Sequence, residues 1–480
     1  MAFEDMLHPL LERYLRAPQW VRTPVGKAYA MIPPRWRRGR HYPRFQEEAA
    51  LSGQAVEELA RAKLARTLTH ALQNVPAYRP WQALLKDLDP AAPQALLPHL
   101  PLLSKETLRA NLSGYLAEGV PETARQAFFT GGTTSLPLRF YLHKGRSRPR
   151  EEAYMEQFRR RAGIPPRATA LHLRGFAVPG AGIPGRPLWM LEPIKRHLVL
   201  STDHLVRPYM EQYVAAMRAW KPSYIEAFAS ALYPLAVWLK EHPAPDVTNR
   251  IRAVLLFSEN VLDHQADLMR EVFDCPVLKH YGHSERVLMA ASMPDDPRYF
   301  FWPQYGRLEL VDASGNPVTR PGMLGEIVGT GFDNDVMPLL RYRTGDMAIL
   351  GAGSHPLLPG FPALERIEGR MQEFIVCQDL SLMSLNSLTT GEQEGALGQV
   401  DALQFAQREP GRLLLRVVAA RPLDAETRRR IARRFEARIP GGCTVEVAEV
   451  DALARTPRGK QQMLLQELDI RPWFEAGGRA

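Results

Sequence analysis

Hydrophobic residues follow different spacings in different parts of this chain, and the spacing predicts the local structure. Near the N-terminus, Leu64, Leu68 and Leu72 recur at helical spacing, and the run stops at NVPAYRP. The segment before them, residues 32–45 (IPPRWRRGRHYPRF), is rich in arginine and proline. A short basic run of this kind is usually a solvated loop, so we expect a loop here rather than an arm that binds nucleic acid.

The middle of the chain has the pattern of a β-α-β unit. Residues 253–257 (AVLLF) predict a buried strand, apolar residues at helical spacing follow as far as Phe273, and PVLKHYG begins a second strand. Such units build parallel sheets, in which ligands collect outside the carboxyl ends of the strands. The segments FSEN (257–260) and YGHSE (281–285) follow the two strands and are therefore placed for chemistry.

The C-terminal part of the chain predicts a small α+β unit. RLLLRVV and TVEVAEV read as strands on either side of a helix that begins near Asp424, a residue suited to cap it. Ile431, Phe435 and Ile439 share one face of this helix. The other faces carry Arg428, Arg429, Arg430, Arg433, Arg434 and Arg438. These arginines indicate either a solvated surface or a docking face for an acidic carrier protein.

Length and composition narrow the class of protein. The chain has 480 residues, enough for two or three domains, and its 45% apolar and 24% charged residues are those of an ordinary globular protein. No run approaches the ~20 apolar residues that span a bilayer, and the N-terminus does not read as a signal peptide. We therefore expect a cytoplasmic protein without a membrane span. Cys275, Cys377 and Cys443 form no CxxC pair, which indicates neither a disulfide framework nor a structural zinc.

The net charge of +9 favours anionic partners such as nucleotides, coenzyme A, acidic carrier proteins or nucleic acid. Basic residues are spread through the chain and no recognised nucleic-acid module is present, so we expect no nucleic-acid partner. The stretch FFTGGTTSLPL (128–138) suggests a nucleotide instead. Backbone N–H groups of a glycine-rich turn form a nest for anionic oxygens, and threonine hydroxyls add donors. The lysine that closes a Walker loop is absent, which disfavours an ordinary P-loop ATPase.

Four further motifs follow this loop in order: YGHSE, RYRTGD (341–346), GRMQEFI (369–375) and TPRGK (456–460). Together with the loop they resemble the signature series of the acyl-adenylate-forming superfamily. The sequence around these motifs is most similar to the phenylacetate–coenzyme A ligase branch and its relatives from capsular polysaccharide clusters. VPAYRP, FASAL (228–232), GEIVGTGF and MPLLRYRTGD add to the likeness, which spans about residues 60 to 465.

The resemblance implies a two-domain α/β enzyme. Residues 1–369 would form a large ATP- and acid-binding domain with mixed or parallel sheets, and residues 370–480 a small mobile α+β lid that turns about a hinge at Gln372. In that family a carboxylic acid attacks the α-phosphorus of ATP to give an acyl adenylate and pyrophosphate. The acyl group then passes to coenzyme A or to another thiol or amine, so ATP and Mg²⁺ are the implied cofactors.

The resemblance also assigns roles to single residues. Glu285 would hold Mg²⁺, Asp346 and Arg370 would contact the ribose, and Lys460 would reach the α-phosphate and the reacting carboxylate. Tyr281 would lie against the adenine. The full set implied for ATP or AMP is Thr130, Gly131, Gly132, Thr133, Thr134, Ser135, Tyr281, Gly282, Ser284, Asp346 and Arg370. The acid pocket would lie near Arg174, Phe228, Ala229 and His283.

Several positions depart from the family pattern. Ser135 replaces the usual glycine and Leu136 a frequent lysine, so we expect modest ATP affinity. Glu373 stands where the family prefers Asp, which keeps the charge on a longer side chain. The turn after the hinge lacks the glycine that meets the thiol arm in many coenzyme A ligases. The acceptor therefore stays open between coenzyme A, an amine, a sugar amine and a carrier-protein thiol. A degenerate relative that binds nucleotide without turnover, as a scaffold in a biosynthetic complex, is the alternative.

Overall fold

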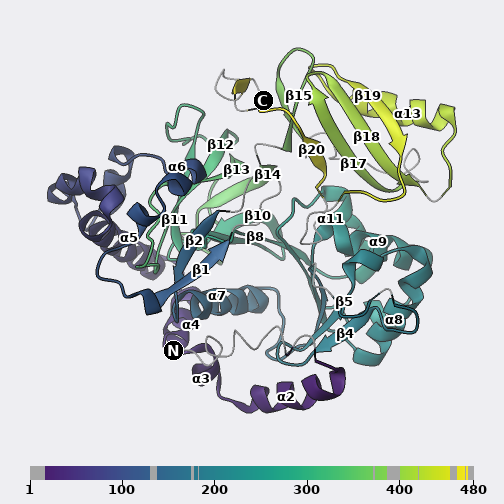
Figure 1. Cartoon of the computed structure of the whole chain (residues 1–480), viewed down its shortest axis with the longest axis horizontal. Coiled ribbons are helices and arrows are strands. Elements are labelled where there is room, and N and C mark those ends of the chain that lie inside the picture. Colours follow the sequence, from purple (N-terminus) through teal and green to yellow (C-terminus); the bar gives the residue numbers. More distant parts are fainter. Residues whose placement is uncertain are drawn as a thin grey trace.

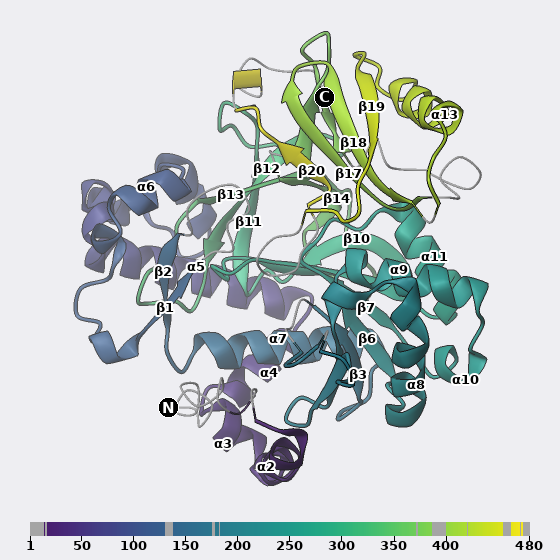
Figure 2. The same cartoon turned by 45° about the vertical axis from the view of Figure 1, so that its right-hand side comes forward.

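A twelve-stranded mixed β-sheet runs through the centre of the molecule, and helices flank it (Figures 1 and 2). The computed structural model describes residues 14, 17–129, 138–174, 178–181, 183–370, 373–385, 400–419, 421–454, 462–470 and 472–473. From edge to edge, the strand order is β11-β12-β13-β14-β10-β9-β8-β7-β6-β3-β5-β4. The strands are β3 (Ala170–Leu173), β4 (Trp189–Glu192), β5 (His197–Leu200), β6 (Tyr224–Ala227), β7 (Val254–Phe257), β8 (Val277–Gly282), β9 (Met289–Met293), β10 (Asp296–Phe301), β11 (Gly306–Val311), β12 (Leu324–Gly331), β13 (Tyr342–Leu350) and β14 (Ala363–Arg370).

Helices contribute the outer layers and the N-terminal part. The described α-helices are α2 (Gln19–Met31), α3 (Pro34–Arg38), α4 (Tyr42–Ala50), α5 (Gln54–Asn74), α6 (Lys105–Ala110), α7 (Ser147–Arg161), α8 (Met210–Trp220), α9 (Ala229–Glu241), α10 (Pro245–Thr248), α11 (Asp263–Phe273) and α13 (Ala425–Glu436). A separate hairpin pairs β1 (Arg125–Phe129) antiparallel with β2 (Arg139–His143).

The direction of the strands changes in the middle of the large sheet. Strands β5, β3, β6, β7 and β8 are parallel to their neighbours in this run, whereas β9 pairs antiparallel with β8. The predicted β-α-β unit is present as β7, α11 and β8, and the apolar helix positions Ala266, Met269 and Phe273 are buried against the parallel half. The expected α/β fold with parallel strands is therefore confirmed.

The N-terminal region is helical, as its sequence suggested, but one segment departs from the prediction. The leucines at helical spacing lie on α5, which ends at Asn74 as expected. The expectation of a solvated loop over residues 32–45 is wrong, because α3 and the start of α4 occupy it. Tyr42 and Phe45 are only 2% and 1% exposed. Packing of these two rings, rather than helix propensity, explains why a proline- and arginine-rich segment is helical.

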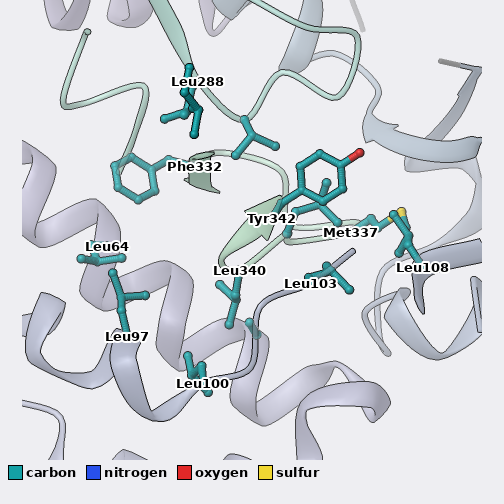
Figure 3. Close-up of a cluster of buried hydrophobic side chains, with 14 of the residues drawn as sticks. Leu64, Leu97, Leu100, Leu103, Leu108, Leu288, Phe332, Met337, Leu340 and Tyr342 are labelled. Carbon is teal, nitrogen blue, oxygen red and sulfur yellow. The ribbon is translucent and has the colours of Figure 1, made fainter. Parts of the chain in front are cut away.

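The largest hydrophobic cluster lies between α5 and the antiparallel half of the sheet (Figure 3). Leu64 of α5 belongs to this cluster together with side chains from the strands and their loops, including Leu288, Phe332 and Tyr342. The hydroxyl oxygen of Tyr342 points out of this cluster in Figure 3. A tyrosine ring is thus held firmly in an apolar setting while its hydroxyl is directed elsewhere.

One buried ion cluster ties the N-terminal helices to the strands. The ammonium of Lys63, 1% exposed, lies 2.5 Å from Glu48 of α4 and 2.6 Å from Asp333, which follows β12. Because a buried charge must be paired, each of these groups depends on the others. The cluster fixes α4 and α5 against the end of β12.

A second, smaller sheet lies near the C-terminus. It has the order β19-β18-β17-β20 and comprises β17 (Val400–Glu409), β18 (Arg412–Ala419), β19 (Thr444–Glu449) and β20 (Leu464–Gln466). As predicted, α13 connects β18 to β19, and the Asp424 carboxylate caps it by accepting from the Thr427 backbone N–H at 2.7 Å. Ile431 and Phe435 of α13 are fully buried in the hydrophobic cluster that the helix forms with this sheet. This sheet lies beyond β14, at the top of Figures 1 and 2.

Candidate functional site

The predicted site residues of the middle region lie where β8 ends. Tyr281 and Gly282 are the last residues of the strand, and His283, Ser284 and Glu285 follow it. Arg286 comes next and has a positive φ of 54°. A non-glycine residue rarely takes this conformation, which costs on the order of 1 kcal/mol and is found preferentially at functional sites.

The Glu285 carboxylate is 5% exposed and accepts a hydrogen bond from the Tyr342 hydroxyl at 2.5 Å. Burial raises the pKa of Glu285, but His283, the ammonium of Lys105 and the Tyr342 hydroxyl outweigh it and bring the pKa below its usual value. The group is therefore ionised at neutral pH. Burial in turn raises the pKa of the Tyr342 hydroxyl well above its ordinary value, so this hydroxyl stays a donor.

A second carboxylate, Asp346, lies on β13 beside the same strand end. Its Oδ2 accepts from the Tyr281 hydroxyl at 2.8 Å, and its Oδ1 lies 3.7 Å from the Arg370 guanidinium. Asp346 and Arg370 are direct register partners on β13 and β14. Three residues from motifs far apart in the sequence are thus brought together, and the carboxylate keeps acceptor capacity for hydroxyl groups.

The end of β14 is held to the end of β7. The Asn260 side-chain amide donates to the Glu368 carbonyl at 3.2 Å and to Glu373 Oε2 at 2.7 Å. Gly369 lies between these groups with φ of +104°, where an added Cβ would collide with Glu373 and Asn260. Only glycine fits both this backbone conformation and this close approach. Glu373 therefore anchors Asn260 with the longer side chain that replaces the family's preferred Asp.

The hairpin β1–β2 packs against the segment that carries Glu285. The Arg286 guanidinium lies over the Phe128 ring at 5.6 Å, and its Nη1 donates to Ser147 Oγ of α7 at 2.8 Å. The buried Arg150 guanidinium of α7 donates to the Arg286 carbonyl at 2.7 Å. These contacts fix the strained Arg286 and place Phe128, in the strand that precedes the glycine-threonine loop, against the residue that follows Glu285.

The four residues proposed for the acid pocket lie at the carboxyl ends of parallel strands. Arg174 follows β3 and stacks over Phe257 at the end of β7, with 4.0 Å from guanidinium carbon to ring centroid. Phe228 lies between β6 and α9, Ala229 is the first residue of α9, and both are buried in the hydrophobic cluster of the parallel half. His283 follows β8, and both its ring nitrogens are buried without a hydrogen-bond partner among the described residues. The sheet therefore brings all four to one edge.

A buried polar cluster lies behind Arg174. Glu226 of β6 pairs with the Arg159 guanidinium of α7 at 2.8 Å and lies 3.7 Å from His172 Nδ1 and 4.0 Å from Arg174. His172 and His197 stack with centroids 4.7 Å apart and planes inclined by 16°. Ligand atoms of His172, His197 and Glu226 lie within 4.8 Å of one another.

This cluster is a poor metal site. Lone pairs of stacked, nearly parallel imidazoles do not converge on one point, and two guanidiniums already neutralise Glu226. The Glu285 carboxylate suits Mg²⁺ better. Mg²⁺ prefers oxygen ligands and is commonly bound through one or two carboxylates together with phosphates and water. Glu285 is buried, ionised and followed by Arg286, which packs on the hairpin, and this fits such a role.

Some predicted residues lie outside the described part of the chain. These are the loop residues from Thr130 to Pro137, the hinge residue Gln372 and the cation Lys460. Their roles stay predictions. Conversely, sequence reasoning assigned no role to Tyr342 or Lys105, although Tyr342 lies within the RYRTGD motif. Asn260 belongs to the FSEN segment that was expected at the end of a strand, whereas no local signal marks Lys105, whose ammonium reaches the Thr344 carbonyl across the sheet.

No protein-family model matches the sequence. Among curated proteins, the chain is 19% identical to protein CapK of Staphylococcus aureus over 378 residues, which are 77% of this chain and 80% of that protein. It is 23% identical to phenylacetate–coenzyme A ligase of Pseudomonas putida over 181 residues, 36% of this chain and 39% of that protein.

Solved structures of 2-hydroxyisobutyryl-CoA ligase are similar over most of the chain. Two of them, in the postadenylation state with R3-HIB-AMP or 2-HIB-AMP, cover 87% of this chain and 91% of theirs, with TM-scores of 0.61 and 0.62 at 15% and 16% identity. The same ligase in the thioesterification state, with 2-HIB-AMP and CoA, covers 90% and 94% with a TM-score of 0.51 at 16% identity. The chain has the fold of these ligases, which confirms the fold that the resemblance of its motifs implied.

Proposed function

We propose that this protein activates a carboxylic acid with ATP, forming an acyl adenylate and pyrophosphate, and then transfers the acyl group to coenzyme A or to another thiol or amine. The observation that carries the proposal is the convergence of two separate carboxylates at one strand end. Asp346 lies with Tyr281 and Arg370, and the ionised Glu285 precedes a residue that packs on the strand leading into the glycine-threonine loop. The similarity to phenylacetate–coenzyme A ligase supports an acid ligase.

Each carboxylate would have a distinct task. Asp346 has two acceptor oxygens, one of which faces Arg370, so it can accept from a pair of ribose hydroxyls while Arg370 contacts the same sugar. Tyr281, oriented by Asp346, would lie against the adenine. Glu285 would hold Mg²⁺, which would neutralise charge on the phosphates. The loop from Thr130 to Pro137 would cradle the β- and γ-phosphates, and Gly282 and Ser284 would also contact the nucleotide.

The acid would bind at the carboxyl ends of the parallel strands, near Arg174, Phe228, Ala229 and His283. These side chains combine a cation, an aromatic surface and an imidazole at one sheet edge. Displacement at phosphorus needs positioning and charge neutralisation more than covalent help. The cation for the reacting carboxylate and the α-phosphate would be Lys460.

Lys460 belongs to the part of the chain that we propose as a mobile lid. Residues 1–369 would form the nucleotide- and acid-binding domain, and residues 370–480 would turn about Gln372 between the two half-reactions. The separate C-terminal sheet, with its own hydrophobic cluster, supports a unit that moves as a body. The thiol or amine acceptor would enter after this movement.

The test is ATP–pyrophosphate exchange over a panel of carboxylic acids. We expect exchange with at least one acid, and a loss of ~10²-fold or more in Lys460→Ala, because an electrostatic contact to the reacting centre is removed. Arg458→Ala, which removes a cation from the same TPRGK motif, is the matched control and should retain most activity. Exchange that is equal in wild type and Lys460→Ala would remove Lys460 from the mechanism.

A scaffold that binds nucleotide without turnover is the second candidate, because Ser135 and Leu136 depart from the family's phosphate loop. Calorimetry separates the two functions. ATP binding without exchange for any acid of a broad panel would support the scaffold. Binding together with exchange would exclude it.

A further inference from the structure

Helix α2 turns an apolar stripe toward solvent. Trp20 and Met31 are 78% and 84% exposed, and the exposed Pro24, Lys27 and Ala28 lie between them at spacings that place all five on one side of the helix. The opposite side buries Arg22, Gly26 and Tyr29. An ordinary surface helix buries its largest apolar side chains, whereas α2 exposes Trp20 and Met31 and buries Arg22.

Specific contacts hold α2 in this orientation. A Cβ on Gly26 would lie 2.6 Å from Pro193, so the helix backbone packs directly on the residues that follow β4. The buried Arg22 guanidinium donates to Gln19 Oε1 at 2.9 Å and to the Met190 sulfur at 3.0 Å. Because this side is fixed, the helix cannot roll to bury its tryptophan. The exposed stripe is therefore a property of the fold.

The same segment is strongly basic. Residues 19–40 contain six lysines and arginines and no acidic residue, a net charge of +6 in a chain whose total is +9. Arg38 is engaged by Glu156 at 2.9 Å, whereas Lys27 and Arg40 are exposed. Trp36 of α3 lies among these arginines and is 64% exposed. Exposed tryptophans and exposed cations thus occur together in one short segment.

We propose that α2 and α3 bind the surface of an anionic lipid bilayer. Tryptophan favours the membrane–water interface, and a helix with an apolar stripe flanked by lysine or arginine lies in the plane of that interface. Each basic residue near anionic headgroups strengthens binding by a factor of about five. Among the described residues, no helix is both long and apolar enough to cross a bilayer, so the attachment is peripheral.

The placement of the two helices suits this attachment. In both views α2 and α3 lie together at the lower edge of the molecule, at the end opposite to the C-terminal sheet (Figures 1 and 2). A bilayer at this edge leaves the C-terminal sheet on the side that faces away from the lipid. Membrane binding and movement of the C-terminal part are therefore compatible.

Two other occupants fit the observations less well. Nucleic acid would engage the cations, but it gives no reason for Met31 and Trp20 to be held in solvent. A second copy of the chain would set two basic faces against each other in a symmetric contact, which like-charge repulsion opposes. An anionic bilayer satisfies both the charge and the apolar stripe.

The test is co-sedimentation of the purified full-length chain with phosphatidylcholine vesicles, with and without phosphatidylglycerol. We expect binding to the anionic vesicles, weakened by salt. Trp20→Gln combined with Met31→Gln should lower the partition coefficient by about tenfold or more. Lys27→Glu combined with Arg40→Glu should lower it by more than about tenfold.

The matched control is Leu357→Gln combined with Met323→Gln, which removes two exposed apolar side chains, 69% and 50% exposed, outside α2 and α3. It should bind vesicles as the wild type does, and all variants should keep the wild-type circular dichroism spectrum. Failure of the wild type to sediment with anionic vesicles would overturn the proposal. So would equal binding by all variants, a dimer that the α2 substitutions dissociate, or an RNA oligonucleotide bound in place of vesicles.

Discussion

Removing the hydroxyl of Tyr342 tests how Glu285 is kept ionised. The substitution Tyr342→Phe leaves the ring in the hydrophobic cluster of Figure 3, where the residue is fully buried, and deletes only the oxygen that lies 2.5 Å from Glu285 Oε1. No large cavity results, because one oxygen is lost. The change therefore acts chiefly on the carboxylate.

The expected magnitude follows from the charge of the acceptor. A hydrogen bond to an ionised group contributes about 1.5–3 kcal/mol, whereas one between neutral groups contributes about 0.5–1.5 kcal/mol. We expect Tyr342→Phe to lower the free energy of unfolding by about 1.5–3 kcal/mol at neutral pH, and by less once Glu285 is protonated. Since the native pKa of Glu285 lies below its usual value, its ionised form stabilises the fold above the unfolded pKa, and this stabilisation is lost as the pH falls through the native pKa.

Urea denaturation over a series of pH values measures the loss of stability. ATP–pyrophosphate exchange over the same series measures the effect on activity. The variant lacks a group that lowers the pKa of Glu285, so the acid limb of its activity should move to higher pH. Tyr213→Phe is the control, because its buried hydroxyl donates at 2.9 Å to the uncharged Ser201 carbonyl. A stability loss that does not change with pH, together with an unmoved acid limb, would refute the reasoning.

Three further substitutions probe the site and its supports. Asp346→Asn removes the charge that faces Arg370, and we expect the KM for ATP in the exchange assay to rise by about tenfold or more, with little change in the thermal unfolding midpoint. Lys63→Met removes the buried cation between Glu48 and Asp333, which among the described residues keep the more exposed Arg44 and Arg66 as partners, and should cost about 1.5–3 kcal/mol of unfolding free energy, part of which returns when both carboxylates are also neutralised. Gly306→Ala would drive a methyl group into the Val287 carbonyl and should cost about 1–3 kcal/mol, measured by urea denaturation.

Local patterns in the sequence predicted the elements whose stability is local or repetitive. The apolar run before Ser258 and the helical spacing up to Phe273 describe β7 and α11 well, and Asp424 caps α13 as expected. The helices α3 and α4 were missed because the prolines and the glycine of residues 32–45 are local signals for turns and loops. Their formation depends on burying Tyr42 and Phe45, which is a tertiary effect that no short window contains.

In the candidate site, too, local motifs predicted some residues, and others depend on long-range strand pairing. The motifs identified Tyr281, Glu285, Asp346 and Arg370 one by one, and the pairing of β13 with β14 explains why two of them face each other. The order of twelve strands involves pairings between distant segments, which residue spacing does not encode. Tyr342 was missed for that reason, since its hydroxyl reaches Glu285 only after β13 has found its place in the sheet.

The change of strand direction at β8 has a consequence for redesign of the protein. Under the proposed function, residues on the parallel side of this strand select the acid, whereas Asp346 and Arg370, on the antiparallel side, grip the nucleotide. The acid site and the nucleotide site would then lie on different halves of one sheet and meet only at β8. Exchanging the loops after β3 and β6 for those of a relative should therefore change the preferred acid and leave nucleotide binding unchanged.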